Sequence, residues 1–152
     1  MKRIVLYLIV LLCCPHVWAQ HMDFCGVELT GTIRNVSDKM RKAGFKLKEK
    51  RTDDCFYIFE GKFCGQTTFF NVNYTPKTKT VYQVRVTPRH INEEAFLDSL
   101  IAKYGSEYES TGEGYCWSKE NGGIFYIKKD HYDPFVVIID AEGMELRKKE
   151  GR

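Results

Sequence analysis

Apolar residues recur at helical spacing in two segments of the chain, and each segment has clear end signals. The first begins at Thr32, a good helix N-cap, and ends at Gly44. The second begins at Asn92, ends at Gly105 and carries Leu100 in the middle of its apolar stripe. These patterns predict two helices.

Elsewhere, apolar and polar residues alternate with the period of two that is typical of β-strands. The predicted strands cover residues 45–50, 55–64, 66–74, 81–87, 114–118, 123–128 and 135–140. The last of these is apolar on both faces, which predicts a central strand. Residues 24–29 are predicted to be extended, and residues 147–152 to form a charged, frayed tail.

This order of elements predicts an α+β fold, with an antiparallel β-sheet and two helices packed on one face. Because a helix followed by strands occurs twice, we interpret the two halves as a diverged (worn) repeat of one helix-plus-strands unit. Met40 and Leu100 then hold matching helix positions. Residues 20–152 have the length of a single ordinary domain.

Residues 1–19 have the layout of a secretory signal peptide, with two basic residues followed by an apolar run. The run, residues 4–14, is shorter than the roughly 20 residues that span a bilayer. Cleavage is predicted after Ala19, which gives an exported protein, periplasmic or secreted, with no transmembrane segment in the mature chain. The alternative is a lipoprotein anchored through Cys13 or Cys14.

The composition narrows the choice of partners. The formal charge of the whole chain is +3, but loss of the two basic residues of the signal leaves 21 Lys and Arg against 20 Asp and Glu. A net charge this close to zero does not indicate nucleic-acid binding, which usually needs a strongly basic domain. A local basic cluster at residues 39–51 is interpreted as a solvated helix face and an edge strand protected by lysines.

Four cysteines belong to the predicted mature chain: Cys25, Cys55, Cys64 and Cys116. An even number in an exported protein makes all four candidates for disulfides, with three connectivities open. The alternative is that some of them are buried free thiols. No C-x2-C pair is present, so no zinc site is predicted.

Candidate catalytic chemistry is sparse. A thiol hydrolase would need Cys116 beside His131, with Asp130 or Asp133 orienting the imidazole. We favour the simpler interpretation of a disulfide cysteine and a surface turn. The same loop, residues 130–133, lacks a distant partner residue that would complete a metal site. We therefore predict no catalytic residues, no metal and no cofactor.

Two aromatic residues are candidates for a binding surface. Phe69 falls on the polar face of its strand beside Asn71 and Asn73, and Trp117 is also predicted to be accessible. Exposed aromatic rings beside amides are suited to a protein contact or to sugar stacking. The alternative is that a loop or helix covers them.

Several segments together resemble a family of small exported bacterial proteins of unknown function. They are FCGVELTGT at residues 24–32, the helix end at residues 44–45, FEGKFCG at residues 59–65 and KYG at residues 103–105. The resemblance implies bacterial export and one compact domain, and it implies no activity. From these observations we expect an exported, non-catalytic module that binds another envelope or extracellular macromolecule. The alternatives are a glycan-binding accessory domain and a small thiol hydrolase that uses Cys116 and His131.

Overall fold

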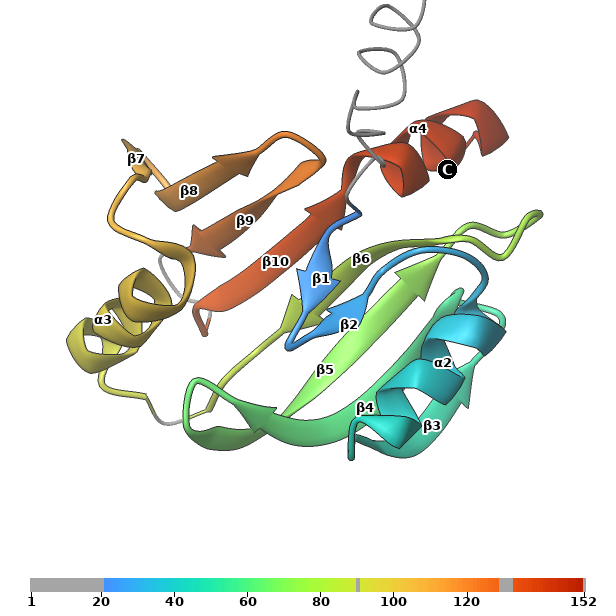
Figure 1. Ribbon diagram of the computed structural model, residues 1–152, viewed down its shortest axis with the longest axis horizontal. Helices are drawn as coiled ribbons and strands as arrows, with labels where there is room; N and C mark the ends of the chain where they lie inside the picture. The colour runs from blue at the N-terminus through green and yellow to red at the C-terminus, as the bar shows by residue number, and fades with distance from the viewer. Residues whose placement is uncertain (1–20, 90, 129–132, 152) are drawn as a thin grey trace, which may run out of the picture.

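The computed structural model describes residues 21–89, 91–128 and 133–151, which fold around one large antiparallel sheet (Figure 1). Its strands are β3 (Lys46–Arg51), β4 (Phe56–Phe63), β5 (Gln66–Tyr74), β6 (Val81–Val86), β7 (Glu109–Thr111), β8 (Gly114–Lys119), β9 (Gly122–Ile127) and β10 (Phe135–Asp140). A separate small ribbon pairs β1 (Asp23–Phe24) with β2 (Val27–Glu28). The helices are α2 (Ile33–Lys42), α3 (Glu93–Tyr104) and α4 (Ala141–Glu150).

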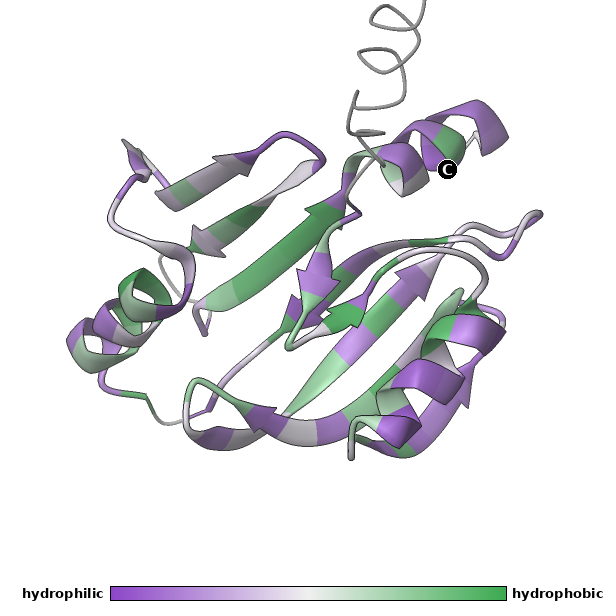
Figure 2. Cartoon of the chain, in the orientation of Figure 1, coloured by the Kyte–Doolittle hydropathy of each residue, from purple (hydrophilic) through white to green (hydrophobic). Residues whose placement is uncertain are grey.

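The strand order divides the large sheet into two halves. Hydrogen bonds link neighbours in the order β3-β4-β5-β6-β10-β9-β8-β7. In each half a helix precedes four strands that pair in sequence, and the halves meet where β6 pairs with β10. Figure 2 shows β10 as an almost continuously hydrophobic strand. Its central place confirms what its sequence predicts.

The predicted alternation along the strands is confirmed on the inner face of the sheet. One row of mutually opposite residues crosses five strands, and each member is at most 1% exposed: Phe59, Phe70, Val86, Val136 and Tyr126. The β1–β2 ribbon and α3 cover this row, because Phe24 lies 4.6 Å from Phe70 and Phe96 lies 5.6 Å from Tyr126 between ring centroids. The inner face is therefore the core of the molecule.

Both predicted helices form, with the predicted ends. The hydroxyl of Thr32 and the side-chain carbonyl of Asn92 accept hydrogen bonds from the first turns of α2 and α3, at 3.5 and 3.1 Å. Gly44 and Gly105 follow the helices with φ values of +92° and +100°, which glycine adopts readily. The local end signals in the sequence thus fix both helices.

The C-terminal segment differs from the sequence prediction, because α4 (Ala141–Glu150) was not predicted and includes residues 147–150 of the expected frayed tail. Its N-terminus is held by the buried residue Asp140, whose carboxylate accepts hydrogen bonds from the backbone N–H of Gly143 at 3.0 Å and of Met22 at 3.1 Å. The described chain therefore has three helices, and it is richer in sheet than the expected two-helix fold.

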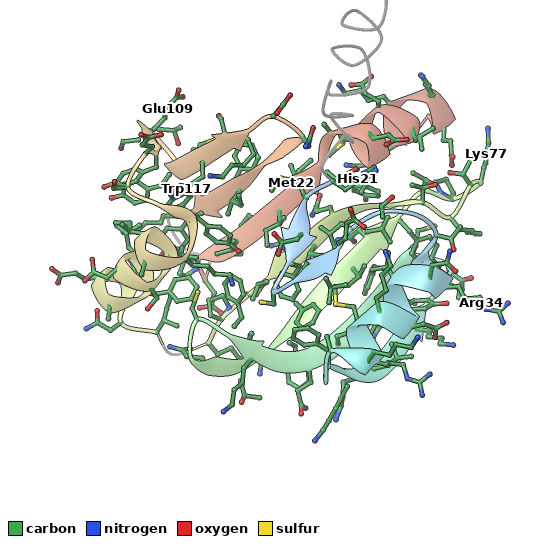
Figure 3. All side chains as sticks on the ribbon, in the orientation of Figure 1. His21, Met22, Arg34, Lys77, Glu109 and Trp117 are labelled. Carbon is green, nitrogen blue, oxygen red and sulfur yellow. The ribbon has the colours of Figure 1, made fainter. Side chains whose placement is uncertain are left out.

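The other end of α4 is also held by a distant segment. The carboxylate of Glu150 accepts hydrogen bonds from the backbone N–H groups of Lys77 and Thr78, at 2.7 and 3.1 Å. Figure 3 shows Lys77 at the tip of the loop between β5 and β6. The tail prediction was wrong because these contacts are long-range, and the charged local sequence carries no sign of them.

Substitution of Asp140 tests how far this cap supports the fold. We expect Asp140→Ala to lower the free energy of unfolding by about 1–2 kcal/mol, because two backbone N–H groups lose a buried acceptor. Urea denaturation followed by circular dichroism measures the change. Asp98→Ala, at an exposed position of α3, is the control and should leave the midpoint unchanged. Equal midpoints for both variants would contradict the role assigned to the cap.

Candidate functional site

The face of the sheet opposite the core, here called the outer face, is a candidate binding surface. A second row of mutually opposite residues crosses it: Ile58, Asn71, Arg85, Val137, Phe125 and Cys116. We call this the outer row. It lies one residue out of register with the buried row of the inner face, so its side chains point the other way. The helices α2 and α3 pack on the inner face. Arg85 is exposed, and Ile58, Asn71, Phe125 and Cys116 are partly accessible on the outer face.

The outer row is apolar at its centre and polar on one side. Val137 is 7% exposed, although it faces away from the core, and Phe125 beside it is half-buried. Arg85 lies opposite Val137 on the neighbouring strand, and its guanidinium group stacks 4.0 Å from the ring centroid of Phe135. Such a cation–π contact holds an arginine in a fixed position on the surface.

Phe69 lies on the same face and is the most exposed of the large hydrophobic residues described, with 46% of its surface accessible. It stands opposite Glu60 on β4, while Asn71 and Asn73 follow on its own face of β5. The prediction that Phe69 is exposed beside these amides is confirmed. The strand alternation was sufficient to find it.

The prediction that Trp117 is surface-accessible is wrong. Trp117 is fully buried on the inner face, and its indole N–H donates a hydrogen bond of 2.7 Å to the carbonyl of Gly105 (Figure 3). Its ring lies 5.4 Å from that of Tyr108, which is 36% exposed. Tyr108 thus covers Trp117, and no local pattern of residues marks a loop residue for this role.

No two of the four candidate disulfide cysteines lie at disulfide distance in the structure. Cys116 belongs to the outer row, where its sulfur lies 3.7 Å from the hydroxyl of Ser118. Cys55 is buried, with its thiol 3.8 Å from the carbonyl oxygen of Thr52. Cys25 and Cys64 are partly buried against the core.

The proposed partners of Cys116 in a thiol hydrolase lie outside the described residues, since His131 and Asp130 are not among them. Asp133 is described and exposed. Within the described ranges, no group of three or more His, Cys, Asp or Glu side chains is arranged to hold a metal ion. The Cys116–His131 arrangement therefore stays a prediction from sequence.

A cleft of about 590 Å³ opens beside the end of α2. Phe45 and Gly61 line it, and the two residues are in such close contact that a Cβ atom on Gly61 would lie 2.2 Å from the ring of Phe45. Charges of both signs, Lys46, Lys62 and Glu60, stand around it. The mixed charge of this lining selects no particular ligand.

Comparison with models of protein families, with curated proteins and with solved structures finds no match for this chain. The resemblance to small exported bacterial proteins therefore stays a prediction from the residues that carry it. No helix within the described residues has the length and apolar character needed to cross a membrane.

Proposed function

We propose that the chain is an exported, non-catalytic interaction module that binds a protein partner through the outer face of its sheet. The observation that carries the proposal is the combination of Phe69, 46% exposed, with an outer row that is apolar at its centre. A partner that covers the exposed Phe69 ring and the half-buried Phe125 would remove their apolar surface from water.

The residue types on the outer face support a protein as the partner. Aromatic residues and arginine are enriched at the energetic centres of protein interfaces. Arg85 is already held over Phe135, so a partner carboxylate would meet a guanidinium group that loses little freedom on binding. The export part of the proposal rests on the signal-like pattern of residues 1–19 and on no contact in the structure.

Site-specific photo-crosslinking tests this proposal. A photoreactive benzophenone amino acid at position 69 should give a discrete covalent adduct with one protein in cells of the source organism. The same group at Arg34, which points away from the sheet on α2 (Figure 3), is the matched control and should give none. Competition by unlabelled wild-type protein should remove the adduct, and competition by Phe69→Ala should remove it at least tenfold less effectively. Equal adducts from both positions, or none from position 69, would contradict the proposal.

Glycan binding is the second candidate, and the arrangement of Phe69 with Asn71 and Asn73 on one face of β5 favours it. Sugar rings stack on exposed aromatic rings, and amides supply hydrogen bonds to hydroxyl groups. Retention of the wild-type protein, but not of Phe69→Ala, on insoluble polysaccharide would support this candidate. In that case, the crosslinking experiment should yield no protein adduct.

We also propose that the two halves of the sheet descend from one helix-plus-strands unit. The mirrored strand order around the β6–β10 pair supports this proposal. The outer row crosses that pair, so both halves contribute to the binding surface.

A further inference from the structure

Two tight turns in the described chain share one sequence and one backbone conformation. Phe24-Cys25-Gly26 forms the tip of the β1–β2 ribbon, and Phe63-Cys64-Gly65 forms the tip of the β4–β5 hairpin. The φ values of the Cys-Gly pairs are +51° and +80° in the first turn and +48° and +78° in the second. Two consecutive residues of positive φ are what a two-residue type I′ hairpin turn requires.

This turn corrects the prediction that residues 24–29 form one extended segment. The apolar residues on both sides of Cys25-Gly26 belong to two strands that pair with each other. A cysteine at positive φ is uncommon, because its Cβ atom strains this conformation. Three of the described cysteines have a positive φ, since Cys55 has +59°, but of these only Cys25 and Cys64 precede a glycine in a two-residue hairpin turn.

The two turns are linked by contact between the residues that precede the cysteines, although the cysteines themselves are not at disulfide distance. The rings of Phe24 and Phe63, one residue before each cysteine, stack with centroids 5.5 Å apart and planes 12° apart. Burial raises the pKa of both thiols, that of Cys64 to about 11, while the charge of Lys103 on α3 acts to lower both. The charge of Cys25 also acts on the pKa of Cys64.

The positions of Cys55 and Cys116 argue against their pairing with Cys64, and that of Cys116 also against Cys25. Cys55 and Cys64 lie at opposite ends of β4, which at about 3.3 Å per residue places them roughly 30 Å apart. A disulfide needs Cα atoms within about 7 Å. Cys116 points from the outer face, with the sheet between it and the stacked rings of Phe24 and Phe63.

We propose that Cys25 and Cys64 form an intramolecular disulfide when the protein meets a small-molecule disulfide such as oxidised glutathione. The sulfurs are unbonded in the structure, so the tip of the β1–β2 ribbon must move toward the tip of β4–β5. That ribbon is a separate two-stranded sheet, which leaves its tip free of the hydrogen bonds of the large sheet. The bridge would tie the N-terminal ribbon to the first half of the fold, and it does not depend on the proposed function.

The reaction is a double thiol–disulfide exchange. The first protein thiolate attacks the glutathione disulfide and forms a mixed disulfide, with one glutathione leaving as a thiolate that takes up a proton. The second protein thiolate then attacks the protein sulfur of the mixed disulfide and releases the second glutathione. Two electrons and two protons pass from the protein to glutathione. Because burial keeps both thiols protonated at neutral pH, we expect exchange mainly during folding, when they are exposed.

Peptide mapping tests the pairing without any substitution. The reduced, unfolded protein is refolded with reduced and oxidised glutathione, its remaining thiols are alkylated, and it is digested with trypsin without reductant. Cleavage at Lys and Arg leaves each of the four cysteines on its own peptide, since Cys55, Cys64 and Cys116 fall within residues 52–62, 63–77 and 104–119. We expect one linked pair, joining the peptide that ends at Arg34 to residues 63–77. Four alkylated cysteines, or any other linked pair, would overturn the proposal.

The effect on stability gives a second, independent test. The refolded oxidised protein should melt about 10 °C above the reduced protein, because the bridge closes a long loop in the unfolded chain. This difference should vanish in Cys25→Ser and in Cys64→Ser, and it should persist in the control Cys116→Ser. A difference that persists in Cys25→Ser, or no difference in the wild-type protein, would contradict the bridge.

Discussion

Replacement of Trp117 by alanine is expected to lower the free energy of unfolding by about 3–5 kcal/mol. The indole ring is fully buried, and its N–H donates a 2.7 Å hydrogen bond to the carbonyl of Gly105 at the end of α3. Its ring also packs 6.1 Å from that of Tyr104. Alanine would leave a cavity and an unpaired carbonyl between α3 and β8. Since small domains have about 5–15 kcal/mol of stability in total, this is a large fraction.

Urea denaturation followed by circular dichroism measures the loss. Trp117→Phe is the matched control, because it keeps most of the ring volume and removes only the N–H donor. We expect its cost to be less than half that of the alanine variant. A wild-type midpoint for Trp117→Ala would mean that the ring is exposed, as the sequence alone predicted, and would restore Trp117 as a candidate surface residue.

The contrast between Phe69 and Trp117 shows what strand alternation can predict. Phe69 lies in the long strand β5, where alternating buried and exposed residues leave no doubt about which face it occupies. Trp117 lies in the shorter β8, where Tyr115, Cys116 and Trp117 follow one another and only Lys119 is charged, so no clear alternation is visible. What decides its burial is the segment after α3, where Gly105 and Tyr108 close over the ring. That contact is tertiary and has no local signal.

The helices show the same division between local and long-range information. Thr32 and Asn92 are local caps followed by an apolar stripe, so α2 and α3 could be predicted with their ends. In α4 the cap residue Asp140 also closes β10, and it was assigned to that strand alone. The outer row could not be predicted as a surface, because its members come from six strands. The order of these strands in the sheet depends on long-range pairing, which no single segment of the sequence reveals.

The second large effect is expected from Leu100→Ala, which should lower the free energy of unfolding by about 2–5 kcal/mol. Leu100 is fully buried and lies one turn after Phe96 on the side of α3 that faces the sheet. Removal of its side-chain carbons would leave a cavity under the helix, because the strands beneath cannot move to fill it. The size of the loss therefore measures how firmly α3 is packed on the second half of the sheet.

Leu97→Ala provides the matched control, since it is the same chemical change in the same helix at a half-buried position. We expect it to cost about 1 kcal/mol or less, in proportion to the smaller apolar area that it removes from burial. Denaturation midpoints of the two variants and the wild type, measured in urea with a common slope, give both values. If the two leucines cost the same, or if Leu100→Ala leaves the midpoint unchanged, then α3 does not pack on the sheet through the predicted stripe. Another element would then have to cover the inner face of the second half of the sheet. The assignment of the outer face as the binding surface would also have to be revised.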